Sequence, residues 1–515
     1  MPPHKTNHRL QLTAFLLLLL FTALAAPSAS RAAITPVEPA SDDRGVYLLS
    51  EPGHLLWFRD TVNTVSADIN AKLTKDIDLS EGGSPSHWTP IGQYTSGDIE
   101  DNGYAGSFDG GGFTVSGYIV ASADAVSADK DGNLAAGLFG LVGQSADIRG
   151  LTVGGGVSVD ISDSVEYLCV GGIAGINYGK ITNNIHSGGE VSAYSGYYTN
   201  YAGGIAGINR GTITNCAHSG GEVSAYGGSL NNYAGGIAGI NSDTITNCVN
   251  SGGVSASGSS RNYSGGIAGI NYGKITNNVH NGGDVSASGG SYNYAGGIAG
   301  NNGGTIINNA HSGGNVSVYD SSYQHYAGGI AGYNSKGNIS NSCWAAGDLE
   351  AVGDGDKGPD AVSADVVSLD AAEMKKVVTT VLSVERTLSV EIGGSVPALI
   401  SYPGRAEDMT NYLSVSGDIY VASPEIAGIS GSWPCTVYGK KPGVTAVSFD
   451  IGLRATDFSD KDNLKPLAKS CVTDPLYFTV TVAQPKRGGS SHGCAAGLGA
   501  LPMLALIPLW LRKKR

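Results

Sequence analysis

Charged residues are scarce in this chain of 515 residues. Asp, Glu, Lys and Arg make up 15% of it, against roughly a quarter in an ordinary soluble domain. Cations are the rarer sign, and the net charge of −13 excludes a protein that binds nucleic acid through a basic face. Cysteine is also sparse, with 7 residues and no C-x-x-C pair, so a structural zinc site has no ligand set.

Glycine is the residue in excess, with 78 copies and no three-residue period of the collagen type. The hydrophobic fraction of 41% excludes a disordered acidic tail. Neither H-E-x-x-H nor G-x-x-x-x-G-K occurs, so the sequence offers neither a zinc-peptidase helix nor a phosphate-binding loop. The composition therefore favours a weakly charged β protein, and we expect no catalytic residue, metal or cofactor.

The N-terminus has the pattern of a secretory signal peptide. Basic residues around Lys5 and Arg9 precede an apolar run from Leu10 to Ala25, and small-residue cleavage patterns follow. We therefore predict a signal peptide over residues 1–33 and export of the protein. An uncleaved membrane anchor is the alternative, although the run is short for a spanning helix.

The C-terminal segment, residues 486–515, has three parts. A Gly/Ser spacer precedes Cys494, an apolar stretch follows, and Arg512–Arg515 close the chain. A basic cluster after an apolar helix stays cytoplasmic, which leaves the rest of the chain outside. The tail resembles the Synergist-CTERM sorting domain, a relative of GlyGly-CTERM tails. That resemblance implies cleavage by a membrane protease and surface attachment, with a plain tail anchor as the alternative. It assigns sorting and processing to Gly488, Gly489, Gly493 and Cys494.

A pentapeptide, GGIAG, recurs along the middle of the chain at spacings of 32, 32, 30, 31 and 32 residues. Such a period indicates a repeat array. In all six units, isoleucine lies two residues and asparagine six residues after the first glycine. In the first five units, isoleucine also lies ten residues and asparagine twelve residues after it. The copies begin at Gly171, Gly203, Gly235, Gly265, Gly296 and Gly328.

Stacking of one coil on the next explains this pattern. Like positions then lie about 4.8 Å apart, so the isoleucines form inward columns and the asparagines form amide ladders. Asn and Gly also tolerate the left-handed backbone of a sharp corner. We therefore expect an all-β fold: a right-handed parallel β-solenoid (β-helix). A sandwich or a propeller is the alternative, although a propeller blade needs longer units.

The units GGIAGINYGKITNN and GGIAGINRGTITNC resemble the GLUG motif. This motif occurs in bacterial surface proteins and beside the peptidase part of some IgA-specific peptidases. The resemblance implies a surface-exposed solenoid without chemistry of its own, and no peptidase domain is recognisable here. We assign residues 45–135 to an N-terminal capping part, with a short amphipathic helix at His54–Val62, and residues 136–350 to the repeats.

The composition changes after the repeats. A Gly/Asp-rich stretch and a capping box at Asp370 and Glu373 predict a linker and short helix over residues 351–382. Residues 383–484 alternate valine with serine, which predicts a small β-sandwich, and they resemble bacterial Ig-like domains. Export would place Cys435 and Cys471 in an oxidising compartment. We expect a disulfide between them, with two free thiols as the alternative.

Four clusters in the repeats and after them are candidate sites. Cys216 and Cys248 are expected to stack as thiols, with a disulfide as the alternative. The histidine column could bind a transition metal, but we expect a solvated ladder. A calcium loop at Asp354–Asp365 is broken by Pro359. Acidic residues that lie nineteen positions after the first glycine of the GGIAG units should form a column, which Val254 interrupts. The histidines are His186, His218, His280 and His311, and the acidic column holds Glu190, Glu222, Asp284 and Asn315.

The sequence thus predicts a non-enzymatic cell-surface protein with an adhesive or envelope-structural role. Its expected partners are surface glycans or proteins of a host or neighbouring cell, since tyrosines such as those of Ser195–Tyr201 suit glycan stacking. The alternative is a carbohydrate-active β-helix enzyme such as a polysaccharide lyase. That chemistry needs acidic and basic side chains that converge, and no Lys/Arg column accompanies the acidic one.

Overall fold

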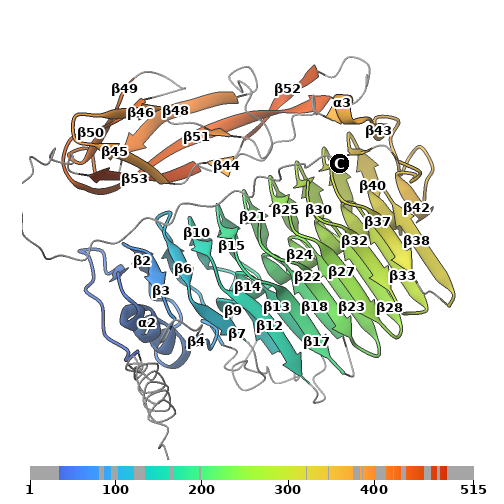
Figure 1. Ribbon diagram of the computed structural model, residues 1–515, viewed down its shortest axis with the longest axis horizontal. Coiled ribbons are helices and arrows are strands. Elements are labelled where there is room, and N and C mark those ends of the chain that lie inside the picture. The colour runs from blue at the N-terminus through green and yellow to red at the C-terminus, as the bar shows by residue number, and fades with distance from the viewer. Residues whose placement is uncertain are drawn as a thin grey trace, which may run out of the picture.

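The repeats form a parallel β-solenoid in which each coil contributes strands to five sheets (Figure 1). The structure is a computed structural model. It describes residues 34–80, 86–93, 103–120, 134–161, 167–196, 199–319, 322–345, 347–374, 383–384, 387–397, 400–401, 413–421, 423–430, 436–457, 465–472 and 476–483.

The five sheets are numbered in the order in which one coil visits them, and within each sheet the strands follow one another coil by coil. Sheet 1 contains β1 (Tyr47–Leu49), β2 (Ala71–Leu73), β5 (Ser107–Asp109), β10 (Asp147–Arg149), β15 (Lys180–Thr182), β20 (Thr212–Thr214), β25 (Thr244–Thr246), β30 (Lys274–Thr276), β35 (Thr305–Ile307) and β40 (Asn338–Ser340). Sheet 2 contains β3 (Ile77–Asp78), β6 (Thr114–Ser116), β11 (Thr152–Val153), β16 (Ile185–His186), β21 (Ala217–His218), β26 (Val249–Asn250), β31 (Val279–His280), β36 (Ala310–His311), β41 (Cys343–Ala345) and β43 (Val367–Leu369).

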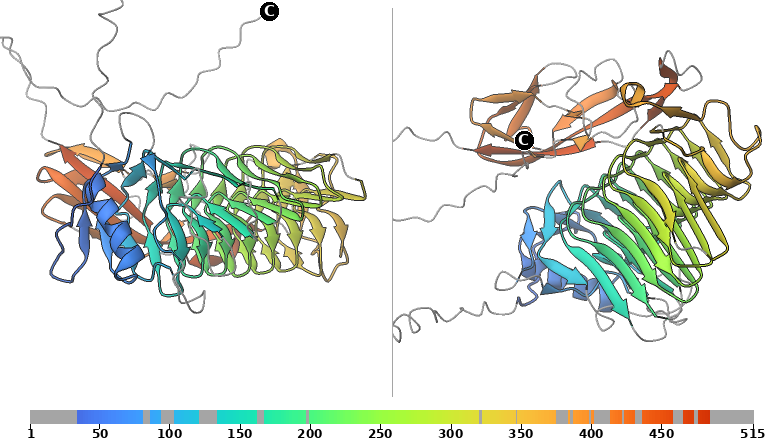
Figure 2. Two further views of the ribbon diagram at one scale, coloured as in Figure 1. Left: turned by 90° about the horizontal axis from the view of Figure 1, so that it is seen from below. Right: turned by 45° about the vertical axis from the view of Figure 1, so that its right-hand side comes forward.

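The other three sheets complete the coil, and Figure 2 shows the stack from two further sides. Sheet 3 contains β4 (Ser86–His87), β7 (Tyr118–Val120), β12 (Gly156–Ile161), β17 (Val191–Ser195), β22 (Val223–Gly227), β27 (Val254–Gly258), β32 (Val285–Ser288) and β37 (Val316–Tyr319). Sheet 4 contains β8 (Leu134–Ala136), β13 (Tyr167–Gly171), β18 (Thr199–Gly203), β23 (Asn231–Gly235), β28 (Arg261–Gly265), β33 (Tyr292–Gly296) and β38 (Gln324–Gly328). Sheet 5 contains β9 (Phe139–Val142), β14 (Ala174–Asn177), β19 (Ala206–Asn209), β24 (Ala238–Asn241), β29 (Ala268–Asn271), β34 (Ala299–Asn302), β39 (Ala331–Asn334) and β42 (Val352–Gly355).

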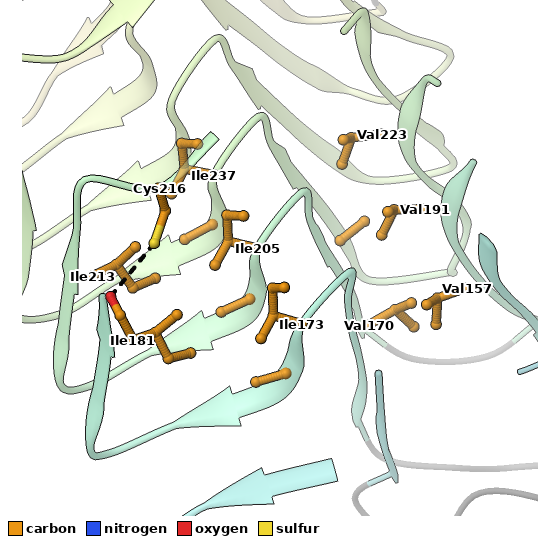
Figure 3. Packing of buried hydrophobic residues seen from close by; sticks show 14 of the residues in the cluster. Val157, Val170, Ile173, Ile181, Val191, Ile205, Ile213, Cys216, Val223 and Ile237 are labelled. Atoms are coloured by element: carbon orange, nitrogen blue, oxygen red, sulfur yellow. Dashed lines mark hydrogen bonds between the residues drawn. The ribbon is translucent and has the colours of Figure 1, made fainter. Parts of the chain in front are cut away.

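Hydrophobic columns fill the interior, as the repeat predicts. Ile181 pairs in register with Ile213 in sheet 1, and Val191 pairs with Val223 in sheet 3. Both isoleucine columns are fully buried in the repeats. Figure 3 shows Ile173, Ile205 and Ile237 one above another, with the valines of sheet 3 on the opposite wall. Each coil therefore completes the core of the next, and no coil could bury its apolar face alone.

Columns of asparagine residues stabilise the turns between neighbouring sheets. At the turn from sheet 5 to sheet 1, each Asn donates through Nδ2 to Oδ1 of the next, with distances of 2.8 Å from Asn177 to Asn209 and 2.8 Å from Asn209 to Asn241. At the turn from sheet 1 to sheet 2, Asn183 and its equivalents adopt positive φ, 57° at Asn183 and 53° at Asn215. Both predicted roles of asparagine, the amide ladder and the left-handed corner, are confirmed.

Two glycines of the GGIAG unit are required by close approach. A Cβ on Gly203 would lie 1.8 Å from the Ala206 carbonyl oxygen, because sheet 4 turns sharply into sheet 5 there. A Cβ on Gly204 would lie 2.5 Å from the His218 ring. The same contact between the second glycine of the unit and a histidine ring recurs in other coils. In the last repeat, the Trp344 ring takes the place of the histidine and lies against Gly329.

The predicted N-terminal helix is confirmed as α2 (Pro52–Thr64). Leu55, Phe58 and Val62 belong to the same buried cluster as the solenoid interior, and the Phe58 ring lies 5.5 Å from the Phe108 ring. The helix thus covers the open end of the first coils, where an uncovered sheet edge would invite aggregation.

The solenoid continues past residue 350, where the composition predicts a linker. Strand β42 pairs in parallel with β39, and β43 pairs with β41. Asn334, the last member of its ladder, donates to the Asp356 carbonyl at 2.8 Å. Residues 351–369 are therefore a shortened last coil, and the linker assignment is wrong for them. The sequence pattern misses this coil because the Asp356 carbonyl takes the place of an asparagine side chain at this corner.

The predicted capping box is confirmed at α3 (Ala371–Met374). The Asp370 N–H donates to the Glu373 carboxylate, and the Glu373 N–H donates to the Asp370 carboxylate, each at 2.8 Å. This reciprocal pair satisfies two backbone donors that a helix start otherwise leaves without partners.

The C-terminal strands form three sheets whose pairings are antiparallel except for β45 with β53. This agrees with the predicted β content, while the Ig-like assignment stays a prediction. Cys435 lies outside the described residues. The strands are β44 (Ser383–Val384), β45 (Thr387–Glu391), β46 (Ser395–Pro397), β47 (Ile400–Ser401), β48 (Leu413–Val421), β49 (Ala427–Ser430), β50 (Thr436–Gly439), β51 (Gly443–Asp457), β52 (Lys465–Val472) and β53 (Leu476–Ala483).

Candidate binding surface

The sorting and disulfide predictions are not tested by the structure. Residues 484–515, with Gly488, Gly489, Gly493 and Cys494, lie outside the described residues, as do residues 1–33 and Cys435. Cys471 lies in β52, and its side chain also lies outside the described part. No helix in the described ranges is long and apolar enough to cross a membrane.

Cys216 and Cys248 lie in neighbouring coils as buried thiols, as predicted. The Cys216 N–H donates to Cys248 Sγ at 3.4 Å. The equivalent position in the next coil is Asn278, whose Oδ1 accepts the Cys248 N–H at 2.7 Å. Burial raises the pKa of the Cys248 thiol well above its usual value. The two cysteines therefore occupy places in a buried column that other coils fill with asparagine.

The histidine column is buried, and the prediction of a solvated ladder is wrong. His186 and His218 stack with ring centroids 5.1 Å apart and share an Nδ1···Nδ1 contact of 3.0 Å. His280 and His311 form a second pair, at 5.0 Å and 2.9 Å. The rings point inward because the second glycine of each GGIAG unit leaves room for them.

Burial sets the protonation of these rings. Desolvation lowers the pKa of His186 and of His280 to about 4. For His218 and His311, the neighbouring histidine adds to desolvation and lowers the pKa to about 3. All four are neutral at pH 7. One nitrogen of each Nδ1···Nδ1 contact must carry the hydrogen while the other accepts it.

The metal-site alternatives gain no support from the geometry. Within the described ranges, no group of three or more His, Cys, Asp or Glu residues could hold a metal ion. In the segment from Asp354 to Asp365, where Pro359 breaks a calcium-loop spacing, Asp356 accepts the Gly358 N–H at 3.2 Å, and Asp365 accepts the Asn341 N–H at 2.8 Å. These carboxylates cap backbone groups of the last coil.

The acidic column lies at the start of sheet 3 and is exposed. Glu190 accepts the Ser224 hydroxyl at 3.3 Å, and Asp284 accepts the Asn315 N–H at 2.8 Å. The strand register shows that Val254 does not belong to this column, contrary to the prediction from the sequence spacing. Val254 pairs with the buried Val223, so Gly253 occupies the outward position beside Glu222.

An aromatic surface on the outside of sheet 4 was not identified from the sequence. Tyr201, Tyr233, Tyr263, Tyr294 and Tyr326 pair in register. Successive ring centroids lie 5.0, 5.1, 5.1 and 5.7 Å apart. We call this set the tyrosine column. Its rings cover one another's faces, and Tyr201, Tyr263 and Tyr294 are at most 9% exposed, so the column presents little more than ring edges. The face-on stacking of sugars that the sequence suggests is therefore not available within the column.

Sheet 5 continues the aromatic surface. Ile176, Ile208, Ile240 and Ile270 project beside the tyrosines, in clusters separate from the main core. Desolvation raises the pKa of Tyr201 and Tyr233 above the usual range and that of Tyr263 to about 12. The outer corner between sheets 4 and 5 is thus partly shielded from water, although it lies outside the solenoid interior.

Two arginines flank the tyrosine column. Arg210 stacks on Tyr178 at 5.6 Å and donates to its hydroxyl at 3.2 Å. Arg261 stacks on Tyr292 at 5.4 Å. The charge of Arg210 lowers the pKa of Tyr201, and that of Arg261 lowers the pKa of Tyr233 and Tyr263, against the larger effect of desolvation. Neither guanidinium forms an ion pair with a described carboxylate.

No protein-family model matches the chain, and no curated protein matches it. One solved structure similar to it is described as a "putative immunoglobulin A1 protease" from Bacteroides ovatus. The two chains are 22% identical, the match covers 66% of this chain and 88% of the other, and the TM-score is 0.39.

Proposed function

We propose that the chain is a non-enzymatic protein of the bacterial cell surface with an adhesive or envelope-structural role. Residues 1–33 would direct export, and the C-terminal segment would attach the protein to the envelope. This function rests on one observation. The residues that recur along the coils have roles in the fold. The outer positions of sheets 4 and 5 instead form an aromatic surface with two arginines that make no ion pair with a described carboxylate.

The recurrent residues support a scaffold role. The isoleucines fill the core, the asparagines bond from coil to coil, and the glycines allow close backbone contacts. Catalysis by such a repeat would need an acid and a base that converge, and no Lys/Arg column accompanies the acidic column. The exposed carboxylates Glu190 and Asp284 accept hydrogen bonds from a neighbouring coil, which is also a role in the fold.

The C-terminal segment supports attachment through a processed end. The Gly/Ser spacer before Cys494 is small enough for a membrane protease to reach, and the terminal Arg and Lys residues would hold the apolar stretch in the inner membrane. The mature protein would lack residues 495–515 and end between Gly489 and Cys494. Intact-mass analysis of protein from native cells tests this, and a mass that includes the terminal RKKR would leave only a plain tail anchor.

Surface exposure and adhesion are tested together on intact cells. Protease added outside should remove the protein, and beads coated with purified protein should bind neighbouring or host cells. Protection from protease in intact cells, or beads that bind no better than albumin-coated ones, would contradict the proposal. Depolymerisation of an acidic polysaccharide that Glu190→Gln and Glu222→Gln abolish would establish the enzyme alternative instead.

A further inference from the structure

The aromatic surface carries cations although the chain as a whole is acidic. The chain has a net charge of −13, yet two exposed arginines, Arg210 and Arg261, stack on tyrosines of this surface. Carboxylates lie at its margins: Asp354 hydrogen-bonds Tyr326 at the end of the column, and Asp243 is exposed in the turn after β24. We propose that this surface binds a glycan that carries carboxylate groups, such as a polyuronate. This inference rests on the proposed surface function and adds its ligand class.

Each chemical group of the surface matches a group of such a glycan. Arg210 and Arg261 are held by stacking on tyrosine rings, which leaves their N–H groups to bind a carboxylate in the paired geometry that guanidinium favours. Tyr233 and Tyr326, the half-buried members of the tyrosine column, offer ring edges beside them. Tyr272 is 56% exposed, so its ring can receive the apolar face of a sugar.

The charge density favours a sparsely charged polymer over nucleic acid or an acidic peptide. Two cations lie beside the tyrosine column, whereas a polyphosphate backbone needs a basic face. The overall negative charge repels polyanions at long range, so binding depends on contacts at the surface itself. A uronate polymer supplies both well-spaced carboxylates and the sugar rings that suit aromatic side chains.

The repeat also predicts a dependence on length. The exposed side chains Arg210, Arg261 and Tyr272 belong to different coils or different sheets of the surface, and coils follow one another about every 4.8 Å, so a long glycan can contact several coils at once. Linked contacts of this kind raise the apparent affinity far above that of one contact. A monosaccharide should therefore bind too weakly to detect at concentrations where the polymer saturates the protein.

The test uses the purified full chain and immobilised polygalacturonate, with its methyl-esterified form as the matched probe. The esterified polymer keeps the sugar rings and loses the carboxylate charge. We expect binding of polygalacturonate at least tenfold tighter than of the ester, weakened by salt. Equal binding of the two polymers, or no binding of polygalacturonate, would overturn the inference.

Variants separate this surface from general charge attraction. Arg210→Gln with Arg261→Gln should weaken binding at least tenfold. The control is Lys75→Gln with Lys441→Gln, which removes two exposed cations that lie outside sheets 4 and 5 and should change binding less than twofold. An equal loss in both double variants, or equal binding of poly-glutamate, would mean nonspecific attraction and overturn the inference.

A further variant guards against unfolding of the arginine variants. Tyr272→Ala removes an exposed ring and should keep the thermal midpoint while it weakens binding severalfold. Unchanged binding in Tyr272→Ala would remove the sugar-stacking part of the inference. If coated beads adhere to cells but polygalacturonate does not bind, the glycan inference fails and the surface function stands. If the beads do not adhere either, both fail.

Discussion

Two polar columns run through the same solenoid, and they differ in how far each can continue. The asparagine column at the turn from sheet 5 to sheet 1 is unbroken, and its last links join Asn271 to Asn302 at 2.9 Å and Asn302 to Asn334 at 3.0 Å. The histidine column at the end of sheet 2 consists of two pairs, His186 with His218 and His280 with His311, separated by Asn250.

The difference follows from the chemistry of the two side chains. An amide has separate donor and acceptor atoms, so each asparagine can accept from one coil and donate to the other. A neutral imidazole has one donor and one acceptor, and in these pairs the Nδ1 atoms face each other. Asn250 instead bonds within its own coil, to the Gly252 N–H and carbonyl at 3.0 Å each. The amide column is therefore independent of pH, and the imidazole pairs are not.

The largest expected effect is a break in the amide column. Asn241→Asp keeps the shape of the side chain but replaces the Nδ2 donor with an acceptor, so the buried Asn271 Oδ1 faces a carboxylate. An uncompensated buried charge should cost about 3–5 kcal/mol of the free energy of unfolding. Urea unfolding followed by circular dichroism measures it. Ser242→Asp, at the exposed neighbouring position, is the control, and equal losses would mean that the column is misassigned.

Acid should weaken the histidine pairs while the amide column is unaffected. The folded pKa of His280, about 4, lies below the unfolded value of about 6.5. The unfolded chain therefore binds more protons as the pH falls, and stability present above pH 6.5 is lost down to about pH 4. Each such histidine contributes roughly 3 kcal/mol to this loss. Thermal melts across this range should show a falling midpoint.

A replacement taken from the chain itself tests the cause of the acid effect. His280→Asn with His311→Asn places asparagine where Asn250 already fits, each followed two residues later by glycine. The acid loss should shrink by about half. The control, His325→Asn at an exposed position, should leave it unchanged. An acid profile that is the same in the double variant would assign the effect to carboxylates elsewhere.

A smaller effect is expected from the glycine that makes room for the imidazole. In Gly204→Ala the added Cβ would lie 2.2 Å from the Gly236 carbonyl oxygen and 2.5 Å from the His218 ring, and overpacking of this kind costs about 1–3 kcal/mol. Gly347→Ala is the matched control, since nothing lies within 4 Å of a Cβ there. Thermal melts at pH 7 compare the two, and equal midpoints would mean that the next coil and the ring can both move aside at no cost.

The smallest effect concerns the cysteines that interrupt another amide column. In Cys248→Asn the new amide can donate to Asn278 Oδ1, as Asn278 does to Asn309 at 3.0 Å. The new Oδ1 can accept the Cys216 N–H, which now meets a sulfur at 3.4 Å. We expect a gain of about 1 kcal/mol, measured by urea unfolding under reducing conditions. A loss of stability would show that the larger side chain does not fit the position.

Strict repetition made the interior predictable from the sequence. The isoleucine columns, the asparagine ladder and the left-handed corner at Asn183 all follow from fixed spacings and the stacking of equivalent positions. The burial of His186 does not follow, because a Gly-rich turn comes directly after it. Its inward direction is clear only once Gly172 is seen to lie against the ring.

Positions that vary or lie outside the core were harder to predict. A second ladder of inward-pointing asparagines joins Asn200 Nδ2 to Asn232 Oδ1 at 2.9 Å. It is not evident from the sequence because His325 occupies the equivalent position in the last repeat. The last coil was hidden by its departure from the repeat. The aromatic surface depends on the sharp turn between sheets 4 and 5, which brings tyrosines of one sheet beside isoleucines of the other, and spacing alone does not reveal the angle between two sheets.

The stacking distance also limits how such an array can be used. One coil consumes 30–32 residues and lengthens the stack by about 4.8 Å, whereas the same residues fully extended would span on the order of 100 Å. Repeats are thus an inefficient means of gaining length. Each additional coil adds mainly breadth: another row of outer side chains on all five sheets. In such an array, repeat number would set the width of the outer face, and reach would depend on other parts of the chain.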